Sequence, residues 1–222
     1  KNKKKSFGFK KFFLALLTLF IVVFLGVGCG LVAIGLDGDK DVSDIHPPAS
    51  SQILDMNGNL ITNIHATENR TLVTLDKIPA NLQNAFIAVE DNRFYEHNGI
   101  DPRGIFRAIY SNLTSGEVAE GGSTITQQLA KNAFLSQDRT FKRKIQEFFI
   151  ALRLERQYTK EEILEMYLNQ IYFGRGAYGV QAAAQTYFGK DVSQLDLSEC
   201  AMLAGIPRST NYYSPLNNLG AA

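Results

Sequence analysis

The hydrophobic pattern divides the chain into three parts. Residues 12–36 form an apolar run without a charged side chain, whereas residues 37–52 are polar and contain Pro47-Pro48. After Pro79, apolar residues recur at spacings of three and four, which is the period of a helix with one buried face. The pattern predicts an apolar segment, a linker and a mainly α-helical domain.

A small β-hairpin is predicted near the start of the domain. Asn57-Gly58 lies between apolar pairs, and both positions of a two-residue turn require the positive φ that Asn and Gly tolerate. Residues 52–61 therefore predict a hairpin, and the extended piece at residues 71–75 is a candidate pairing partner.

Seven helices are predicted after Pro79 from apolar spacing and from the residues at helix ends. Asp101 is followed by Pro at the first helical position, Ser123 and Thr140 are N-caps, and Thr159 opens a capping box. The predicted helices cover residues 82–90, 102–113, 124–134, 141–152, 160–168, 180–188 and 197–205.

One of these helices carries an apolar stripe that the spacing assigns to the core. The stripe includes Phe141, Ile145 and Phe148, whereas Ile105, Ile109 and Leu113 recur along the predicted helix 102–113.

The apolar run at residues 12–36 is predicted to cross a membrane. Its 25 residues exceed the roughly 20 that a helix needs to span the hydrocarbon core. Residues 1–11 hold six lysines and no acidic residue, and Asp37, Asp39 and Asp41 follow the run. This asymmetry predicts a single-pass protein with its N-terminus in the cytoplasm and its domain outside the cytoplasmic membrane.

A cleaved signal peptide with lipid attachment at Cys29 is the alternative. It is less favoured, because the apolar run continues past Cys29 and Gly26 stands where a lipoprotein signal usually has Leu. The only other cysteine is Cys200, so no disulfide framework exists. The net charge of +1 points to no particular partner, and nucleic acid is not expected.

Glu90 and the segment 121–124 are the first candidates for chemistry. Glu90 ends an apolar helical face, and a carboxylate at such an edge suits proton exchange near neutrality. On this residue alone, a solvated Glu at a helix end is the simpler interpretation. Gly121-Gly122 precedes a helix start, where an anion can approach backbone N–H groups closely. A flexible loop without a bound anion is an equally good interpretation of these two glycines.

A basic cluster surrounds the start of the predicted helix 141–152. Cations at a helix N-terminus oppose the macrodipole. The position of Arg139, Lys142, Arg143 and Lys144 therefore favours an external anion such as a diphosphate. The alternative is a solvated basic face with one Arg143–Glu147 pair.

Five motifs in order resemble the glycosyltransferase domain of class A penicillin-binding proteins and of monofunctional peptidoglycan glycosyltransferases. The resemblance extends over residues 72–215. The motifs are residues 90–99 (EDNRFYEHNG), 121–132 (GGSTITQQLAKN), 143–147 (RKIQE), 163–179 (ILEMYLNQIYFGRGAYG) and 203–207 (LAGIP).

This resemblance implies a lysozyme-like, mainly helical domain with a membrane-proximal jaw that admits lipid. The implied activity polymerises lipid II into β-1,4-linked glycan, with inversion at MurNAc C1 and release of undecaprenyl diphosphate. The implied partners are lipid II, the growing glycan strand, membrane lipid and cell-wall synthesis proteins. A divalent cation, Mg²⁺ or Mn²⁺, is the implied cofactor. No organic cofactor is expected, and no cluster of metal ligands is visible in the sequence.

The resemblance also assigns roles to individual residues. Glu90 matches the catalytic base, and Glu147 matches a second essential carboxylate near the diphosphate or its cation. The residues that match donor-phosphate ligands are Lys131, Arg139, Arg143 and Lys144. The other matched substrate-binding positions are Phe94, Ser123, Thr126, Gln128 and Tyr172.

The sequence departs from the family pattern in two respects. It has neither the Ser-x-x-Lys nor the Lys-Thr-Gly motif of a transpeptidase, so penicillin binding is not expected. The family's further helix after Pro215 is also missing, which predicts a domain cut short at its C-terminal end. The expected divisions are a basic tail at 1–11, a transmembrane helix at 12–36, a linker with hairpin at 37–76 and the glycosyltransferase domain at 77–222.

Two other functions stay open from the sequence. A muramidase or lytic transglycosylase would share the fold class and an essential Glu but would not need the basic cluster. A non-catalytic glycan-binding module would need neither Glu90 nor Glu147.

Overall fold

The helical domain is built from seven α-helices in the part of the chain that the structure describes. This computed structural model describes residues 51–57, 60–64, 69–116, 121–136, 138 and 140–221, with residues 14, 17, 18, 26, 28, 30, 33–35 and 42. The helices are α2 (Ala80–Glu90), α3 (Pro102–Ser115), α4 (Ile125–Phe134), α5 (Phe141–Gln157), α6 (Lys160–Gln170), α7 (Val180–Phe188) and α8 (Leu197–Gly205).

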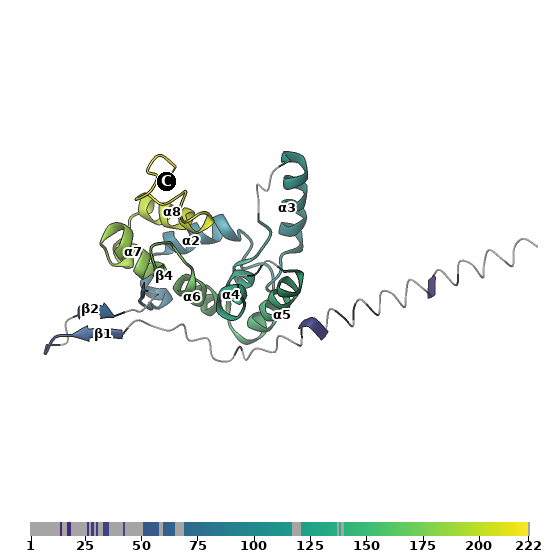
Figure 1. Ribbon diagram of the computed structural model, residues 1–222, viewed down its shortest axis with the longest axis horizontal. Helices are drawn as coiled ribbons and strands as arrows, with labels where there is room; N and C mark the ends of the chain where they lie inside the picture. The colour runs from purple at the N-terminus through teal and green to yellow at the C-terminus, as the bar shows by residue number, and fades with distance from the viewer. Residues whose placement is uncertain are drawn as a thin grey trace, which may run out of the picture.

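The core forms where α2, α4, α6 and α8 meet (Figure 1). Helix α2 packs against α8, and α4 packs against both α5 and α6. Phe86 of α2 meets Tyr167 of α6 edge-to-face at 6.1 Å between ring centroids and Phe173 at 6.0 Å. All three rings are fully buried. Aromatic burial of this kind stabilises the domain and fixes α2, which carries Glu90, against α6.

Helix caps match the sequence prediction in position at α3, α5 and α6, and differ at α4. Thr140 and Thr159 accept the predicted cap hydrogen bonds at α5 and α6. At α4 the cap is Thr124, whose capping box with Gln127 starts the helix one residue later than the predicted Ser123 cap. Asp101 does precede α3, but its side chain makes no cap hydrogen bond.

The β-structure differs from the predicted two-residue turn. Strands β1 (Ser51–Leu54) and β2 (Leu60–Ile64) form the predicted antiparallel hairpin, with Leu54 opposite Leu60. That register leaves residues 55–59 in the connection, of which 58 and 59 lie outside the described residues. The Asn57 N–H donates to Asp55 Oδ1 at 2.8 Å, so a side chain stabilises the bend locally.

The second extended piece, predicted at residues 71–75, does not pair with the hairpin. Strand β3 (Asn69–Arg70) runs parallel to β4 (Ala177–Tyr178) and not beside the hairpin. Residues 71–74 form no strand. The pairing partner lies about a hundred residues away, beyond what local turn signals can indicate.

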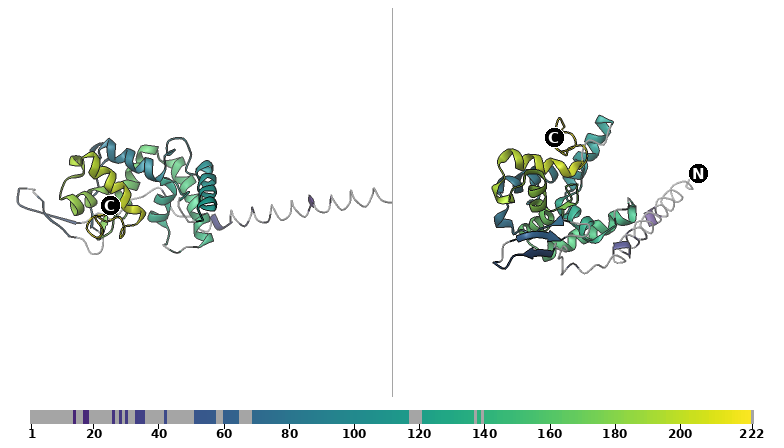
Figure 2. Two further views of the ribbon diagram at one scale, coloured as in Figure 1. Left: turned by 90° about the horizontal axis from the view of Figure 1, so that it is seen from above. Right: turned by 60° about the vertical axis from the view of Figure 1, so that its left-hand side comes forward.

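Helix α3 stands apart from the other helices (Figures 1 and 2). Its buried residues are Gly104 and Ala108. Ile109 is 50% exposed and Leu113 is 79% exposed, so these apolar residues of α3 do not join the core. The prediction that the α5 stripe faces the core was wrong for two residues, Phe141 at 77% and Phe148 at 39% exposed. Apolar spacing marks a face that avoids water, but it does not say what covers that face.

The predicted membrane-spanning helix at residues 12–36 lies largely outside the described residues. Among the residues that the structure does describe, no helix is both long and apolar enough to cross a bilayer.

Candidate active site

Glu90 is the last residue of α2, and it faces the side chain of Gln128 from α4. Gln128 Nε2 donates to Glu90 Oε2 at 2.6 Å. The hydroxyl of Tyr167, from α6, donates to Gln128 Oε1 at 3.5 Å. Three helices therefore hold one carboxylate at the edge of the core. A pocket opens beside it, lined by Glu90, Asp91, Asn92, Asp101, Gly104, Arg107 and residues 121–124.

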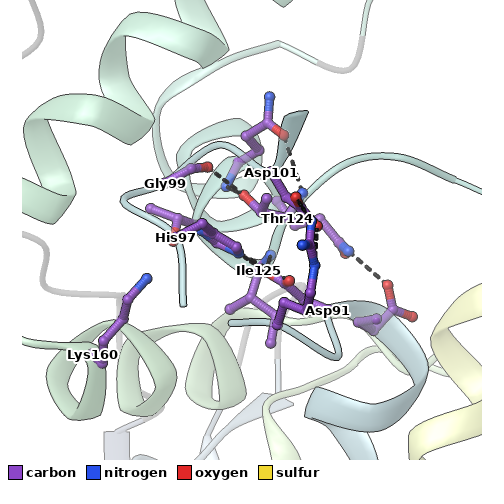
Figure 3. Close-up of polar contacts among 12 residues, drawn as sticks. Asp91, His97, Gly99, Asp101, Thr124, Ile125 and Lys160 are labelled. Carbon is purple, nitrogen blue, oxygen red and sulfur yellow. Dashed lines mark hydrogen bonds and ion pairs between the residues drawn. The ribbon is translucent and has the colours of Figure 1, made fainter. Parts of the chain in front are cut away.

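Asp91, next to Glu90, ties the loop after α2 to the start of α4 (Figure 3). Its buried carboxylate accepts the backbone N–H of Ile125 at 3.0 Å and contacts His97 Nε2 at 2.9 Å. The Thr124 hydroxyl donates to the Gly99 carbonyl at 2.6 Å. A carboxylate is favoured at a helix N-terminus, where backbone N–H groups are unpaired. This network fixes α4 relative to Glu90.

The second carboxylate, Glu147, is buried in α5 among cations. Arg143 Nη1 donates to Glu147 Oε2 at 2.9 Å, and Lys144 Nζ donates to Oε1. These residues lie three and four positions apart, which places them on one helix face. Lys144 Nζ also donates to Ser123 Oγ at 2.8 Å and so joins α5 to the glycine-containing segment.

Lys131 links the two carboxylates electrostatically. Burial lowers the pKa of the Lys131 ammonium, Glu147 and Glu90 oppose that shift, and Arg143 and Lys144 add to it. Lys131 therefore lies within electrostatic reach of these four side chains. Within the described residues, the Lys131 ammonium makes no hydrogen bond.

Comparison with known proteins identifies this arrangement. The model of the transglycosylase family matches residues 57–222. The chain belongs to the transglycosylase family. It is 48% identical over 211 residues to penicillin-binding protein 1F of Bacillus subtilis, covering 93% of this chain and 29% of that protein. It is also 48% identical over 217 residues to penicillin-binding protein 1A of Escherichia coli, covering 96% of this chain and 25% of that protein.

The resemblance seen in the sequence is thereby confirmed, and the chain contains a peptidoglycan glycosyltransferase domain. The crystal structure of penicillin-binding protein 1A from Haemophilus influenzae overlays with a TM-score of 0.40 and 28% identity. That overlay covers 78% of this chain and 16% of the other. The chain spans less than a third of the length of the curated relatives it matches.

Six of the residues predicted for this transglycosylase site gather around Glu90 and Lys131. Glu90, Gln128 and Lys131 come from α2 and α4, while Arg143, Lys144 and Glu147 come from α5. Ser123 joins them through Lys144.

Two predicted substrate ligands are fully buried. Thr126 donates to Glu155 Oε1 at 2.5 Å, and the Phe94 ring lies beneath the Lys160 ammonium at 4.4 Å from its centroid. Lys160 Nζ also donates to Glu155 Oε1 at 2.8 Å. Neither predicted residue presents surface to a substrate in this conformation. Their contacts hold α4 and the first motif in place instead.

The predicted substrate roles of two further residues find no support in the described part of the chain. Tyr172 is 41% exposed, and its ring lies 4.7 Å from that of Tyr178. None of the interactions described links Tyr172 to Glu90 or Glu147. Arg139 lies outside the described residues. Substrate roles for both stay predictions.

Sequence reasoning did not assign roles to the polar side chains around Glu90. Asp91 and His97 form the link to α4, and the Arg93 guanidinium pairs with Asp101. Arg107 also lines the pocket, from the exposed helix α3. The only signal in the sequence was that Asp91, Arg93 and His97 lie in the first motif. Their partners could not be predicted, because tertiary contacts decide them.

Within the described residues, the implied divalent cation has no site built from side chains alone. No three or more Asp, Glu, His or Cys side chains of the described residues gather to hold one. Both oxygens of Glu147 already accept from cations. We therefore derive no catalytic step through a metal.

Proposed function

We propose that this domain polymerises lipid II, with Glu90 as general base and the Lys131–Arg143–Lys144 cations binding the donor diphosphate. One observation carries the proposal: Lys131 lies near enough to Glu90, Glu147, Arg143 and Lys144 for the charge of each to act on its pKa. This arrangement supports a proton acceptor for the acceptor substrate beside an anion site for the donor substrate.

Glu90 would take the proton from the GlcNAc 4-hydroxyl of the acceptor. Only Glu90 Oε2 accepts a hydrogen bond from a described side chain, which leaves Oε1 for the acceptor hydroxyl. As the proton moves to Glu90, the hydroxyl oxygen bonds to MurNAc C1 and the bond from C1 to the diphosphate oxygen breaks. Attack opposite the leaving group would invert C1 and give a β-1,4 link. Substrate binding through fixed groups can keep the reacting atoms aligned.

The cations would stabilise the departing diphosphate. Fixed positive groups in a partly buried site stabilise developing negative charge without reorganisation during the reaction. Glu147 holds Arg143 and Lys144 beside one another despite their mutual repulsion. Among the described residues, the Arg143 guanidinium makes one side-chain hydrogen bond, from Nη1 to Glu147, and its side chain is 15% exposed, so it retains donors for a phosphate oxygen.

A polymerisation assay tests this function against its main rival. Incubation of the protein with lipid II should yield long glycan on a gel, and preformed glycan should stay intact. A muramidase or lytic transglycosylase would instead shorten preformed glycan and release small fragments. The basic cluster favours polymerisation, because the bond cleaved by a lytic enzyme carries no diphosphate.

The divalent cation, the growing strand and cell-wall synthesis proteins stay predictions. In this proposal, the negative charge of the diphosphate is neutralised by Lys131, Arg143 and Lys144.

We also propose that the domain works on the outer face of the cytoplasmic membrane, anchored by residues 12–36. Gly35 is buried, and a Cβ atom there would overlap the Phe149 ring of α5. The end of the apolar run thus lies against the helix that carries exposed Phe141. Helix α3 lies at the same end of the domain and exposes Phe106, Tyr110 and Leu113 (Figure 2). Apolar side chains gathered in this way support a lipid-facing surface.

The anchor should resist salt. The protein should stay in the membrane pellet after a high-salt wash and be released by detergent. Salt screens basic surface contacts, but it does not weaken burial of an apolar helix. Release by salt alone would contradict a membrane-spanning anchor.

Lys131 should control donor binding at alkaline pH. Because its pKa is lowered, its charge is lost at a lower pH than that of an ordinary lysine, and KM for lipid II should then rise. Lys131→Arg keeps its charge, so the rise in KM should move to higher pH, whereas Lys131→Ala should raise KM throughout. Measurement of KM from neutral pH to about pH 10 tests this. An unchanged alkaline rise in Lys131→Arg would assign it to another group.

A further inference from the structure

We propose that Tyr167 is a positioning residue for the general base, and that it acts by fixing the orientation of the Gln128 side-chain amide toward Glu90. The inference rests on the proposed function, since it concerns the same base. It assigns to Gln128 the role of holding Glu90, in addition to any contact with substrate.

The geometry joins three helices through two hydrogen bonds. Tyr167 of α6 donates to Gln128 Oε1 at 3.5 Å, and Gln128 Nε2 donates to Glu90 Oε2 at 2.6 Å. The Tyr167 ring is fully buried and packs edge-to-face on Phe86 of α2. The direction of its hydroxyl is therefore set by the core and not by solvent.

The amide of Gln128 has two orientations of similar shape. Its terminal torsion is soft, and its oxygen and nitrogen differ mainly in hydrogen bonding. An ionised carboxylate only accepts hydrogen bonds, so ionised Glu90 requires the amide nitrogen. A protonated Glu90 could donate to the amide oxygen of the flipped side chain.

Tyr167 opposes that flip. Among the described residues, the Tyr167 hydroxyl has one hydrogen-bond acceptor, Gln128 Oε1. In the flipped orientation, the buried O–H would lose this acceptor, which is unfavourable. Burial raises the pKa of Tyr167 well above its ordinary value, and Glu90 and Asp91 add to the effect. The hydroxyl consequently keeps its proton at any pH where the enzyme works.

Other charged groups also face Glu90, and the test must leave them unchanged. Lys131 faces it from α4, Asp91 follows it in the chain, and Asp101 and Arg107 line the same pocket. Tyr167→Phe alters none of them and keeps the ring that packs on the core.

Tyr167→Phe should shift the acid limb of the kcat profile to higher pH. The loss of one neutral hydrogen bond corresponds to about 0.7 pH unit, so activity within the acid limb should fall about fivefold. Activity should recover at higher pH, and KM for lipid II should stay unchanged. A role in structure alone would lower activity equally at every pH.

A double-mutant cycle and a matched tyrosine complete the test. Gln128→Leu should itself shift the acid limb, and adding Tyr167→Phe should shift it no further, because Tyr167 acts through Gln128. Tyr158→Phe removes a hydroxyl that donates to the Val42 carbonyl at 2.8 Å, and it should leave the limb in place.

The outcomes separate this inference from the proposed function. An unmoved acid limb in folded Tyr167→Phe, or additive shifts in the double mutant, would overturn the inference while wild-type polymerisation persists. If Tyr167→Phe is too unstable to assay, an unmoved limb in Gln128→Leu overturns it equally. Absence of polymer from the wild-type protein would instead refute the proposed function.

Discussion

Glu90→Gln should lower kcat for glycan polymerisation by about 10²–10⁴-fold, the usual contribution of a positioned general base. The amide has nearly the same size, but it cannot take the proton of the acceptor hydroxyl. KM for lipid II should change little, because the cations that would bind the diphosphate lie on α4 and α5. The acid limb of the wild-type pH profile should also disappear in this variant.

Glu96→Gln is the matched control for this prediction. Glu96 belongs to the same motif but is exposed, and none of its side-chain interactions joins it to the site. This variant should retain wild-type kcat. If Glu90→Gln keeps more than about a tenth of wild-type kcat, Glu90 is not the base, and Glu147 becomes the next candidate.

Glu147→Gln should impair both donor binding and folding stability. Glu147 is 2% exposed and accepts from Arg143, which is 15% exposed, and from Lys144, which is 45% exposed. Loss of the negative charge leaves these cations and Lys131 to repel one another. We expect a loss of about 3 kcal/mol in the free energy of unfolding, at the lower end for a broken buried pair because Lys144 is partly solvated.

Such a loss corresponds to a fall of roughly 6–12 °C in the thermal midpoint of a domain of this size. KM for lipid II should rise together with the fall in kcat, unlike in Glu90→Gln. Glu199→Gln is the control, because it breaks the more exposed pair with Lys190 and should shift the thermal midpoint much less than Glu147→Gln does. A Glu147→Gln variant with unchanged thermal midpoint and KM would show that Glu147 does not organise the cations.

The helices and much of the site could be predicted because their signals are local. The capping box that opens α6 involves residues three positions apart, and α2 ends at Glu90 as its apolar spacing indicated. Arg143, Lys144 and Glu147 lie within two helical turns, so their shared face follows from helix geometry alone.

Placement of the other site residues depended on contacts between distant segments. Thr126 and Phe94 lie in site motifs, yet burial against Glu155 and Lys160 removes them from the surface. The hairpin was predicted correctly in position, but its register came from the pairing of two whole strands and not from Asn57 alone.

The sequence by itself determined the helical class, most of the helix starts and the chemical types present, because hydrogen bonds and periodicity within a few residues specify them. Only the tertiary structure decided that Asp91 binds the N–H of Ile125, 34 positions away, and that Tyr167 reaches Gln128. It also decided that the apolar stripe of α3 lies outside the core. Spacing along a helix gives the direction of a side chain, whereas its partner depends on how separate elements pack.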